Sequence, residues 1–194
     1  MYPGYTVYKN PTVKNITSDN NGKEPCYVRM YVDILDSQGV PVGDSQALNL
    51  IYKTIYFDKS FSGGYDKKEG SATGLIQDRI PGYSLAYLAS YPMVNPHWVK
   101  DTARSTASRL VFNYMGENGD GILSNGEEST LFTNIVIPTD WNQTEMQKVG
   151  NYQLKVTAQA IQSKGFSTQS EAYRMLDEEI KGGTLQEVDR DSMS

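Results

Sequence analysis

The chain has 194 residues and a mass of 21.7 kDa, and 38% of its residues are apolar, which is enough for one or at most two domains with a sizeable core. A net charge of −5 and a pI near 4.9 leave no basic stripe to neutralise phosphates, so nucleic acid and anionic membrane surfaces are excluded as expected partners. The mean hydropathy is −0.52 and no apolar stretch approaches the roughly 20 residues that cross a bilayer, so a membrane-spanning segment is excluded too.

The first part of the chain has the alternation of β-structure. Residues 27–35 are the clearest predicted strand, because every second side chain from Val28 to Ile34 is apolar. The turn residues Asp-Ser-Gln-Gly follow at 36–39. Residues 46–57 are apolar and rich in tyrosine, which favours half-buried pleated surfaces, so a further strand is predicted there.

The middle of the chain is predicted to hold a loop, a connection and two more strands. Residues 62–73 collect Ser, Gly, Lys and Asp without periodicity, which indicates an exposed loop. The prolines in residues 80–98 predict mostly connection with short extended pieces. Alternation resumes at 109–114 and 131–137, and the Gly- and Asn-rich residues 116–126 between them are predicted to form a hairpin turn.

The last predicted strand covers residues 152–162. Ala158 and Ala160 share one face of it, and their small size predicts that another element packs closely there. A short helix is predicted just before this strand, at 144–149, and Gly150 ends it.

A longer helix is predicted after Thr168, which forms a capping box with Glu171. Gly182 and Gly183 end this helix, and the polar residues 183–194 are expected to be a flexible tail. Its apolar stripe, expected to dock on the sheet, consists of Ala172, Met175, Leu176 and Ile180.

Many strands with regular turn signals and little helix indicate a mostly β fold. We predict an antiparallel β-sandwich with one or two short helices near the C-terminus, built as a single domain over residues 1–182. Lys9 and Pro11 indicate that the first strand lies at a sheet edge, since lysine blunts edge pairing and proline cannot donate to a ladder.

One stretch resembles a calcium-binding loop. Residues 116–127 match the loop pattern at Asn118, Asp120 and Glu127, which are therefore weak metal candidates. The first ligand position is Gly116, which has no carboxylate, and the flanking segments are predicted strands rather than helices. The hairpin turn is therefore favoured over a calcium site.

The sequence provides few residues for catalysis. Its single cysteine, Cys26, has no neighbouring Cys, His or basic partner, and its single histidine, His97, cannot build the imidazole site that catalytic zinc usually requires. We expect no catalytic residue, no cofactor and no enzymatic activity. Tyr31 and Trp98 are candidates for stacking on sugar rings, so a carbohydrate-binding or adhesive module is the alternative function.

Several blocks, in order along the chain, resemble a known family. The N-terminal block is Pro-Gly-Tyr-Thr-Val-Tyr-Lys-Asn-Pro-Thr-Val-Lys-Asn at 3–15, followed by Tyr-Val-Arg at 27–29. Residues 123–132 resemble L-x-x-G-E-x-T-x-L-F, Val-Ile-Pro follows at 136–138, and residues 154–172 resemble I-x-V-x-A-x-A-I-Q-x-x-G-F-x-x-x-x-x-A. These blocks resemble the TasA/camelysin family of Gram-positive surface proteins, which a SipW-type signal peptidase processes.

This resemblance implies an exported protein of the cell surface or biofilm matrix with a jelly-roll or Ig-like β-sandwich. Its relatives polymerise into fibres by donor-strand exchange, in which an N-terminal strand of one subunit completes the sheet of the next. The expected partner is therefore a second copy, and matrix polysaccharide is a further candidate. The donor strand and the signal peptide are expected upstream of residue 1. Residues 46–95 match no block and are expected to be a variable insertion.

The resemblance does not bring a protease activity with it. Camelysin has been described as a metalloprotease, but this sequence lacks the H-E-x-x-H motif and has one histidine. We therefore expect the purified protein to show no peptidase activity.

Overall fold

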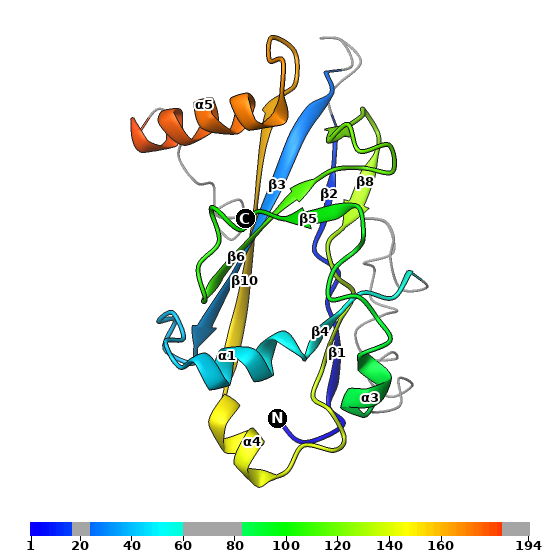
Figure 1. Cartoon of the computed structure of the whole chain (residues 1–194), viewed down its shortest axis with the longest axis vertical. Coiled ribbons are helices and arrows are strands. Elements are labelled where there is room, and N and C mark those ends of the chain that lie inside the picture. The colour runs from blue at the N-terminus through cyan, green and yellow to red at the C-terminus, as the bar shows by residue number, and fades with distance from the viewer. Residues whose placement is uncertain (17–23, 60–82, 184–194) are drawn as a thin grey trace.

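The computed structural model describes residues 1–16, 24–59 and 83–183, and this part of the chain is mostly antiparallel β-sheet with a few short helices (Figure 1). The strands are β1 (Thr6–Tyr8), β2 (Thr12–Lys14), β3 (Cys26–Asp36), β4 (Ile55–Tyr56), β5 (Trp98–Lys100), β6 (Arg109–Tyr114), β7 (Ile122–Leu123), β8 (Glu128–Thr130), β9 (Asn134–Val136) and β10 (Tyr152–Gln162). The helices are α1 (Ser45–Tyr52), α3 (Leu85–Leu88), α4 (Gln143–Val149) and α5 (Gln169–Lys181). The loop predicted at 62–73 and the tail from 184 onward lie outside the described residues.

The largest sheet is built around β3. Its strand order is β10-β3-β6-β5, and β7 also pairs with β3. β10 is antiparallel to β3 along its whole length, from Tyr152 opposite Asp36 to Gln162 opposite Cys26. The strands predicted at 27–35, 109–114 and 152–162 are confirmed as β3, β6 and β10. Because β3 has neighbours on both sides, its apolar row from Val28 to Ile34 is no more than 2% exposed.

The hairpin turn predicted at 116–126 is wrong. β6 and β7 both run antiparallel to β3 on the same edge, with Arg29 opposite Asn113 and Tyr27 opposite Ile122. They are two pieces of one strand, and residues 115–121 form an excursion between them. A hairpin would have reversed the chain at this point. A turn comes later, at Asn125 and Gly126, between β7 and β8.

Two smaller sheets contain the remaining strands. One has the order β1-β9-β4, with Val7 opposite Ile135, and the other pairs β2 with β8, with Val13 opposite Ser129. The strand predicted at 131–137 is shorter than expected, because only β9 is paired there. β1 lies at the end of its sheet, as Lys9 and Pro11 predict.

The main core lies between the inner face of the large sheet and the smaller sheets. From the large sheet it takes apolar side chains of β3, β5, β6 and β7, and from the other side Ile55, Leu131 and Phe132. A second cluster at the lower end in Figure 1 holds Leu48 and Ile51 of α1 against Trp141 before α4. Burying side chains of this size contributes roughly 1.5–3 kcal/mol each.

Residues 46–57 form a helix and a two-residue strand rather than the single strand predicted. Asp44 is the N-cap of α1, and its carboxylate accepts hydrogen bonds from the backbone N–H groups of Gln46 and Ala47. The buried side chains of this helix, Ala47, Leu48 and Ile51, lie on one helical face. The segment expected to be a variable insertion, 46–95, thus supplies α1 and β4 to the core. It also contains α3, where only connection was predicted.

Both helices predicted near the C-terminus are present. Gly150 ends α4 with a φ of 59°, and the Thr168 hydroxyl caps α5 by accepting from the backbone N–H of Glu171. The predicted stripe of α5 is partly wrong: Met175 and Ile180 are each 37% exposed, whereas Tyr173 is buried. The helix is turned so that Tyr173 and Asp177 face a buried arginine of β3, described below.

α5 covers the face of the sheet opposite to the main core (Figure 1). Its buried side chains pack on Tyr27 and Ile161. Ala158 and Ala160 point to the other face and are exposed, so the close packing predicted there is not found. Among the described residues, no helix combines the length and apolar character needed to span a membrane.

Candidate functional site

An apolar groove lies between two sheet edges, those of β1 and β10. Each of these strands is the outermost of its sheet, and no described strand pairs with its outer edge. The groove has a volume of about 630 Å³ and is lined by residues of the N-terminal segment 1–11, by Phe132 and Ile135, and by the first half of β10. In Figure 1, β10 lies beside β3, and β1 lies apart from them, in line with β2.

The β10 wall is an apolar row beside which the structure describes no further strand. Leu154 and Val156 point to the core face of the sheet and line the groove. Their partners across the ladder, Ile34 and Val32, are 0% and 1% exposed, whereas Leu154 and Val156 are only half-buried. In each of these two cross-strand pairs, the side chain on β3 is buried and the side chain on β10 is partly exposed to solvent. One more strand beside β10 would cover them.

The β1 wall faces this row across the groove. Val7 and Ile135 are opposite each other in the β1–β9 ladder, and both line the groove. Ile135 also packs against the main core, so the groove opens into the hydrophobic interior. Lys9 and Pro11 stand along the same wall. A segment entering the groove would thus meet apolar side chains on both walls.

The first residue of β10, Tyr152, lines the groove, and its hydroxyl is hydrogen-bonded to Thr54. The Tyr152 and Thr54 hydroxyl oxygens are 2.7 Å apart, and burial raises the pKa of Tyr152 to about 12. This phenol is therefore neutral at physiological pH, and it adds no charge to the groove. The arrangement is suited to an extended apolar segment.

The candidate metal ligands of the 116–127 loop fold the loop itself. Asp120 accepts a hydrogen bond from the backbone N–H two residues later at 2.9 Å. Glu127 accepts from the backbone N–H of Ser124 at 2.8 Å and from the Tyr114 hydroxyl. Asn118 is exposed. Across residues 1–16, 24–59 and 83–183, no group of three or more His, Cys, Asp or Glu side chains is arranged to hold a metal.

The two candidate stacking residues have other contacts. Trp98 is 3% exposed, and its indole N–H donates to the Ser129 hydroxyl at 2.9 Å. A buried indole has no free face for a sugar ring, so Trp98 belongs to the core. Tyr31 is half-buried, and the guanidinium carbons of Arg29 and Arg109 lie 5.3 and 5.4 Å from its ring centroid. The structure does not bring Tyr31 and Trp98 together, because they point to opposite faces of the large sheet.

Cys26 and His97 contact groups that do not activate them for catalysis. The thiol of Cys26 lies 3.7 Å from the Leu123 carbonyl oxygen, and burial, followed by the charge of Glu127, raises its pKa. A raised thiol pKa disfavours the thiolate that a nucleophile needs. His97 Nε2 is 3.9 Å from a carboxylate oxygen of Glu117.

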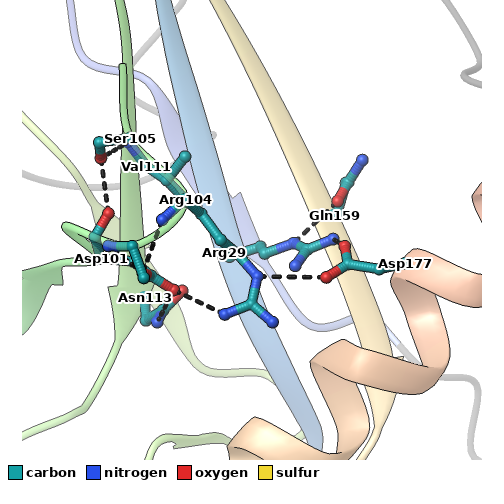
Figure 2. A network of polar contacts seen from close by, with 9 residues as sticks. Arg29, Asp101, Arg104, Ser105, Val111, Asn113, Gln159 and Asp177 are labelled. Carbon is teal, nitrogen blue, oxygen red and sulfur yellow. Dashed lines mark hydrogen bonds and ion pairs between the residues drawn. The ribbon is translucent and has the colours of Figure 1, made fainter. Parts of the chain in front are cut away.

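A buried arginine fastens α5 to the sheet. Arg29 of β3 is fully buried and forms an ion pair with Asp177 of α5, and its Nε donates to the Gln159 side chain at 2.8 Å (Figure 2). Its guanidinium carbon lies 5.0 Å from the centroid of the Tyr173 ring. The second oxygen of Asp177 accepts from Arg104 Nε at 3.1 Å. The network therefore joins β3, β10, α5 and the loop after β5.

The charge state of Asp177 follows from this network. Burial alone would raise its pKa, but hydrogen bonds and charge from Arg29 and then Arg104 hold the pKa of this carboxyl below its ordinary value. Asp101 extends the network by accepting from Arg104 Nη1 at 3.0 Å and from Asn113 at 3.2 Å.

Sequence reasoning missed both the groove and this network. Leu154 and Val156 have the alternation of any core strand, and nothing in the sequence marks β10 as an edge. Arg29 alternates with the apolar row of its strand, and this pattern predicts an exposed side chain rather than a buried one. The signal that could have corrected this is the Asp177 carboxylate, which lies on the same helical face as Ala172, Tyr173 and Leu176.

Comparison of the chain with protein-family models, with curated proteins and with solved structures gives no match.

Proposed function

We propose that this protein is an exported structural protein of the cell surface or biofilm matrix, which assembles into fibres by accepting a β-strand from a second copy of itself. The proposal includes a jelly-roll-type β-sandwich in which the groove between β1 and β10 is the acceptor site. The observation that carries it is the combination of an open apolar groove with the outer edge of β10, beside which the structure describes no further strand. The ordered sequence blocks that resemble the TasA/camelysin family support it independently.

Strand addition suits this groove for two physical reasons. An added strand hydrogen-bonds through its main chain along the 11 residues of β10, which is the source of affinity in β-augmentation. Alternate side chains of the same strand would then cover Leu154, Val156 and Ile135. Covering apolar side chains of this size contributes roughly 1.5–3 kcal/mol each, offset in part by the ordering of the donor.

The donor is proposed to be an N-terminal strand of the neighbouring copy. Met1 and Tyr5 line the groove, so the N-terminal segment of the chain runs beside the acceptor site. With no described strand beside it, the β10 edge presents backbone groups to which a donated strand can pair. Without a donor strand, we expect residues 1–194 to stay monomeric or to form small irregular oligomers. A secreted form that carries a donor strand upstream of residue 1 is expected to form long fibres that resist dissociation.

The experiment places a charge in the groove. Val156→Glu in the secreted form puts a carboxylate where the donor's apolar side chains would pack, whereas Gln162→Glu introduces the same charge at an exposed position at the far end of the same strand. Light scattering and electron microscopy should show fibres for the unchanged protein and for Gln162→Glu, and none for Val156→Glu. Circular dichroism checks that both variants fold.

Three outcomes would contradict the proposal. Equal fibre formation by residues 1–194 and by the secreted form would show that an upstream strand is dispensable. Unchanged fibres from Val156→Glu would place the acceptor site elsewhere. No fibres from any form would favour the adhesive or carbohydrate-binding alternative, which glycan-array binding then tests.

A further inference from the structure

Four tyrosine rings meet where α3 packs against β4, at the end of the molecule opposite α5 (Figure 1). We call Tyr56, Tyr83, Tyr87 and Tyr91 the tyrosine cluster. Tyr56 is buried, with its ring centroid 5.5 Å from that of Tyr91 and 6.4 Å from that of Tyr83. Tyr87 is the outermost member and is 42% exposed. The cluster thus runs from the core to the surface.

Two contacts within the cluster hold its phenols together, and the first is unusually close. The rings of Tyr83 and Tyr87 are stacked, with centroids 4.1 Å apart and planes inclined by 22°. Aromatic pairs in proteins usually have centroids about 4.5–7 Å apart. The hydroxyl oxygens of Tyr87 and Tyr91 are 2.9 Å apart and share a hydrogen bond. Two phenol rings are therefore held face to face, with the hydroxyl of one bonded to a third.

The backbone holds these rings in place. Leu88 of α3 is 6% exposed, and its N–H donates to the Ser84 carbonyl at 3.0 Å. The Tyr83 carbonyl accepts from the Thr139 backbone N–H at 2.9 Å. Tyr87 lies in α3 and Tyr83 directly precedes its N-cap, Ser84, so the backbone is anchored at both members of the stacked pair.

Tyr83 and Tyr91 have raised pKa values, so both phenols are protonated at neutral pH. Burial, followed by the charge and the hydrogen bond of Tyr87, raises the pKa of Tyr83. The hydrogen bond from Tyr87, followed by burial, raises the pKa of Tyr91 to about 12. Oxidation of these side chains at neutral pH therefore removes a proton together with each electron.

We propose that Tyr83 and Tyr87 are an oxidative modification site, at which a haem peroxidase acting with hydrogen peroxide joins the two rings as an intramolecular dityrosine. Each phenol loses one electron and one proton to give a tyrosyl radical. The two radicals form a carbon–carbon bond between ring carbons adjacent to the hydroxyls, and the hydrogen on each of these carbons moves as a proton to the oxygen of its own ring. The two electrons and two protons reduce one hydrogen peroxide to two waters.

Proximity selects this pair over others. The stacking holds the two rings in contact before oxidation, and a preassembled pair reacts as if its partner were present at a very high concentration. Tyr2 is more exposed, at 65%, but it meets the Tyr5 ring edge-on at 5.3 Å. If exposure governed the reaction, Tyr2 would react first and would link one chain to another.

The test uses the folded chain with a haem peroxidase and hydrogen peroxide. Dityrosine fluorescence should appear in the monomer. Tyr83 and Tyr87 lie in one tryptic peptide, residues 80–100, which should lose the mass of two hydrogen atoms. Tyr83→Phe and Tyr87→Phe keep the rings and remove the phenols, so each should abolish this product, whereas the control Tyr2→Phe should leave its yield unchanged. Circular dichroism melts confirm that the variants fold.

The proposal is overturned by either of two results. One is a main product that links separate chains and is lost in Tyr2→Phe. The other is a yield of the lighter peptide that does not change in Tyr87→Phe, which would place the bond on Tyr83 and Tyr91 instead.

Discussion

Removing the charge of Asp177 should destabilise the fold more than removing its buried partner. Asp177→Asn leaves the Arg29 guanidinium, fully buried between two tyrosine rings, without a carboxylate. Breaking a fully buried ion pair from one side costs about 3–5 kcal/mol. The Asp177 side chain is 42% exposed, so water partly replaces it, and we expect a loss of about 2 kcal/mol in the free energy of unfolding.

The opposite substitution tests the asymmetry. Arg29→Met removes the buried charge and leaves Asp177 with Arg104 and solvent, so we expect a loss of about 1 kcal/mol, mainly from packing. The double variant Arg29→Met/Asp177→Asn should cost about as much as Arg29→Met alone, because no buried charge remains to be left unpaired. The control is Glu178→Gln on the exposed Arg174–Glu178 pair of the same helix, which should cost less than about 0.5 kcal/mol.

Urea unfolding followed by circular dichroism gives these free energies, provided that the slope of each transition is unchanged. Hydrogen exchange at the amides of α5 should report the same order, because the network holds this helix on the sheet. Equal losses for Asp177→Asn and Glu178→Gln, or a larger loss for Arg29→Met than for Asp177→Asn, would refute the reasoning.

Three further predictions concern the same network and the loop after β6. Thermal melts with and without millimolar calcium should superpose, and an upward shift that Asp120→Ala removes would contradict this. Because the pKa of Asp177 is lowered in the folded state, its contribution to stability is present above the ordinary carboxyl pKa and is lost as the pH falls through the folded pKa. Between about pH 5 and pH 3, the urea midpoint should therefore fall further for the unchanged chain than for Asp177→Asn. Gly121→Ala should lower the free energy of unfolding by about 1 kcal/mol more than Gly119→Ala, as measured by urea unfolding. Both glycines have positive φ, but only at Gly121 would a Cβ lie 2.5 Å from the Gln169 side chain. Equal losses would show that this contact relaxes freely.

The long elements could be predicted from the sequence because their periodicity is strong. β3, β6 and β10 alternate over many residues, and α5 combines an N-cap, an apolar stripe and terminal glycines. The prediction of a single strand at residues 46–57 was wrong because a short apolar run fits either a strand or a helix. Asp44, two residues before them, is the N-cap signal that distinguishes the two.

The candidate site could not be predicted because it depends on which strands are neighbours. Leu154 and Val156 have the same pattern as Val32 and Ile34, yet one row is open and the other is closed. The difference arises from sheet order, which alternation does not encode. The burial of Arg29 could not be predicted for a related reason: the polar face of β3 is covered by α5, which comes much later in the chain.

The pairing of β3 with β10 also governs how the chain folds. Well over half of the chain lies between Asp36 and its partner Tyr152, so the central ladder has a high contact order, and its formation must overcome the entropy of closing a very long loop. During synthesis, β3 is made early, but it cannot pair with β10 until the chain has been extended to residues 152–162. This ladder therefore forms late in synthesis, and a chain that ends before residue 152 leaves the apolar row of β3 without its neighbour on one side.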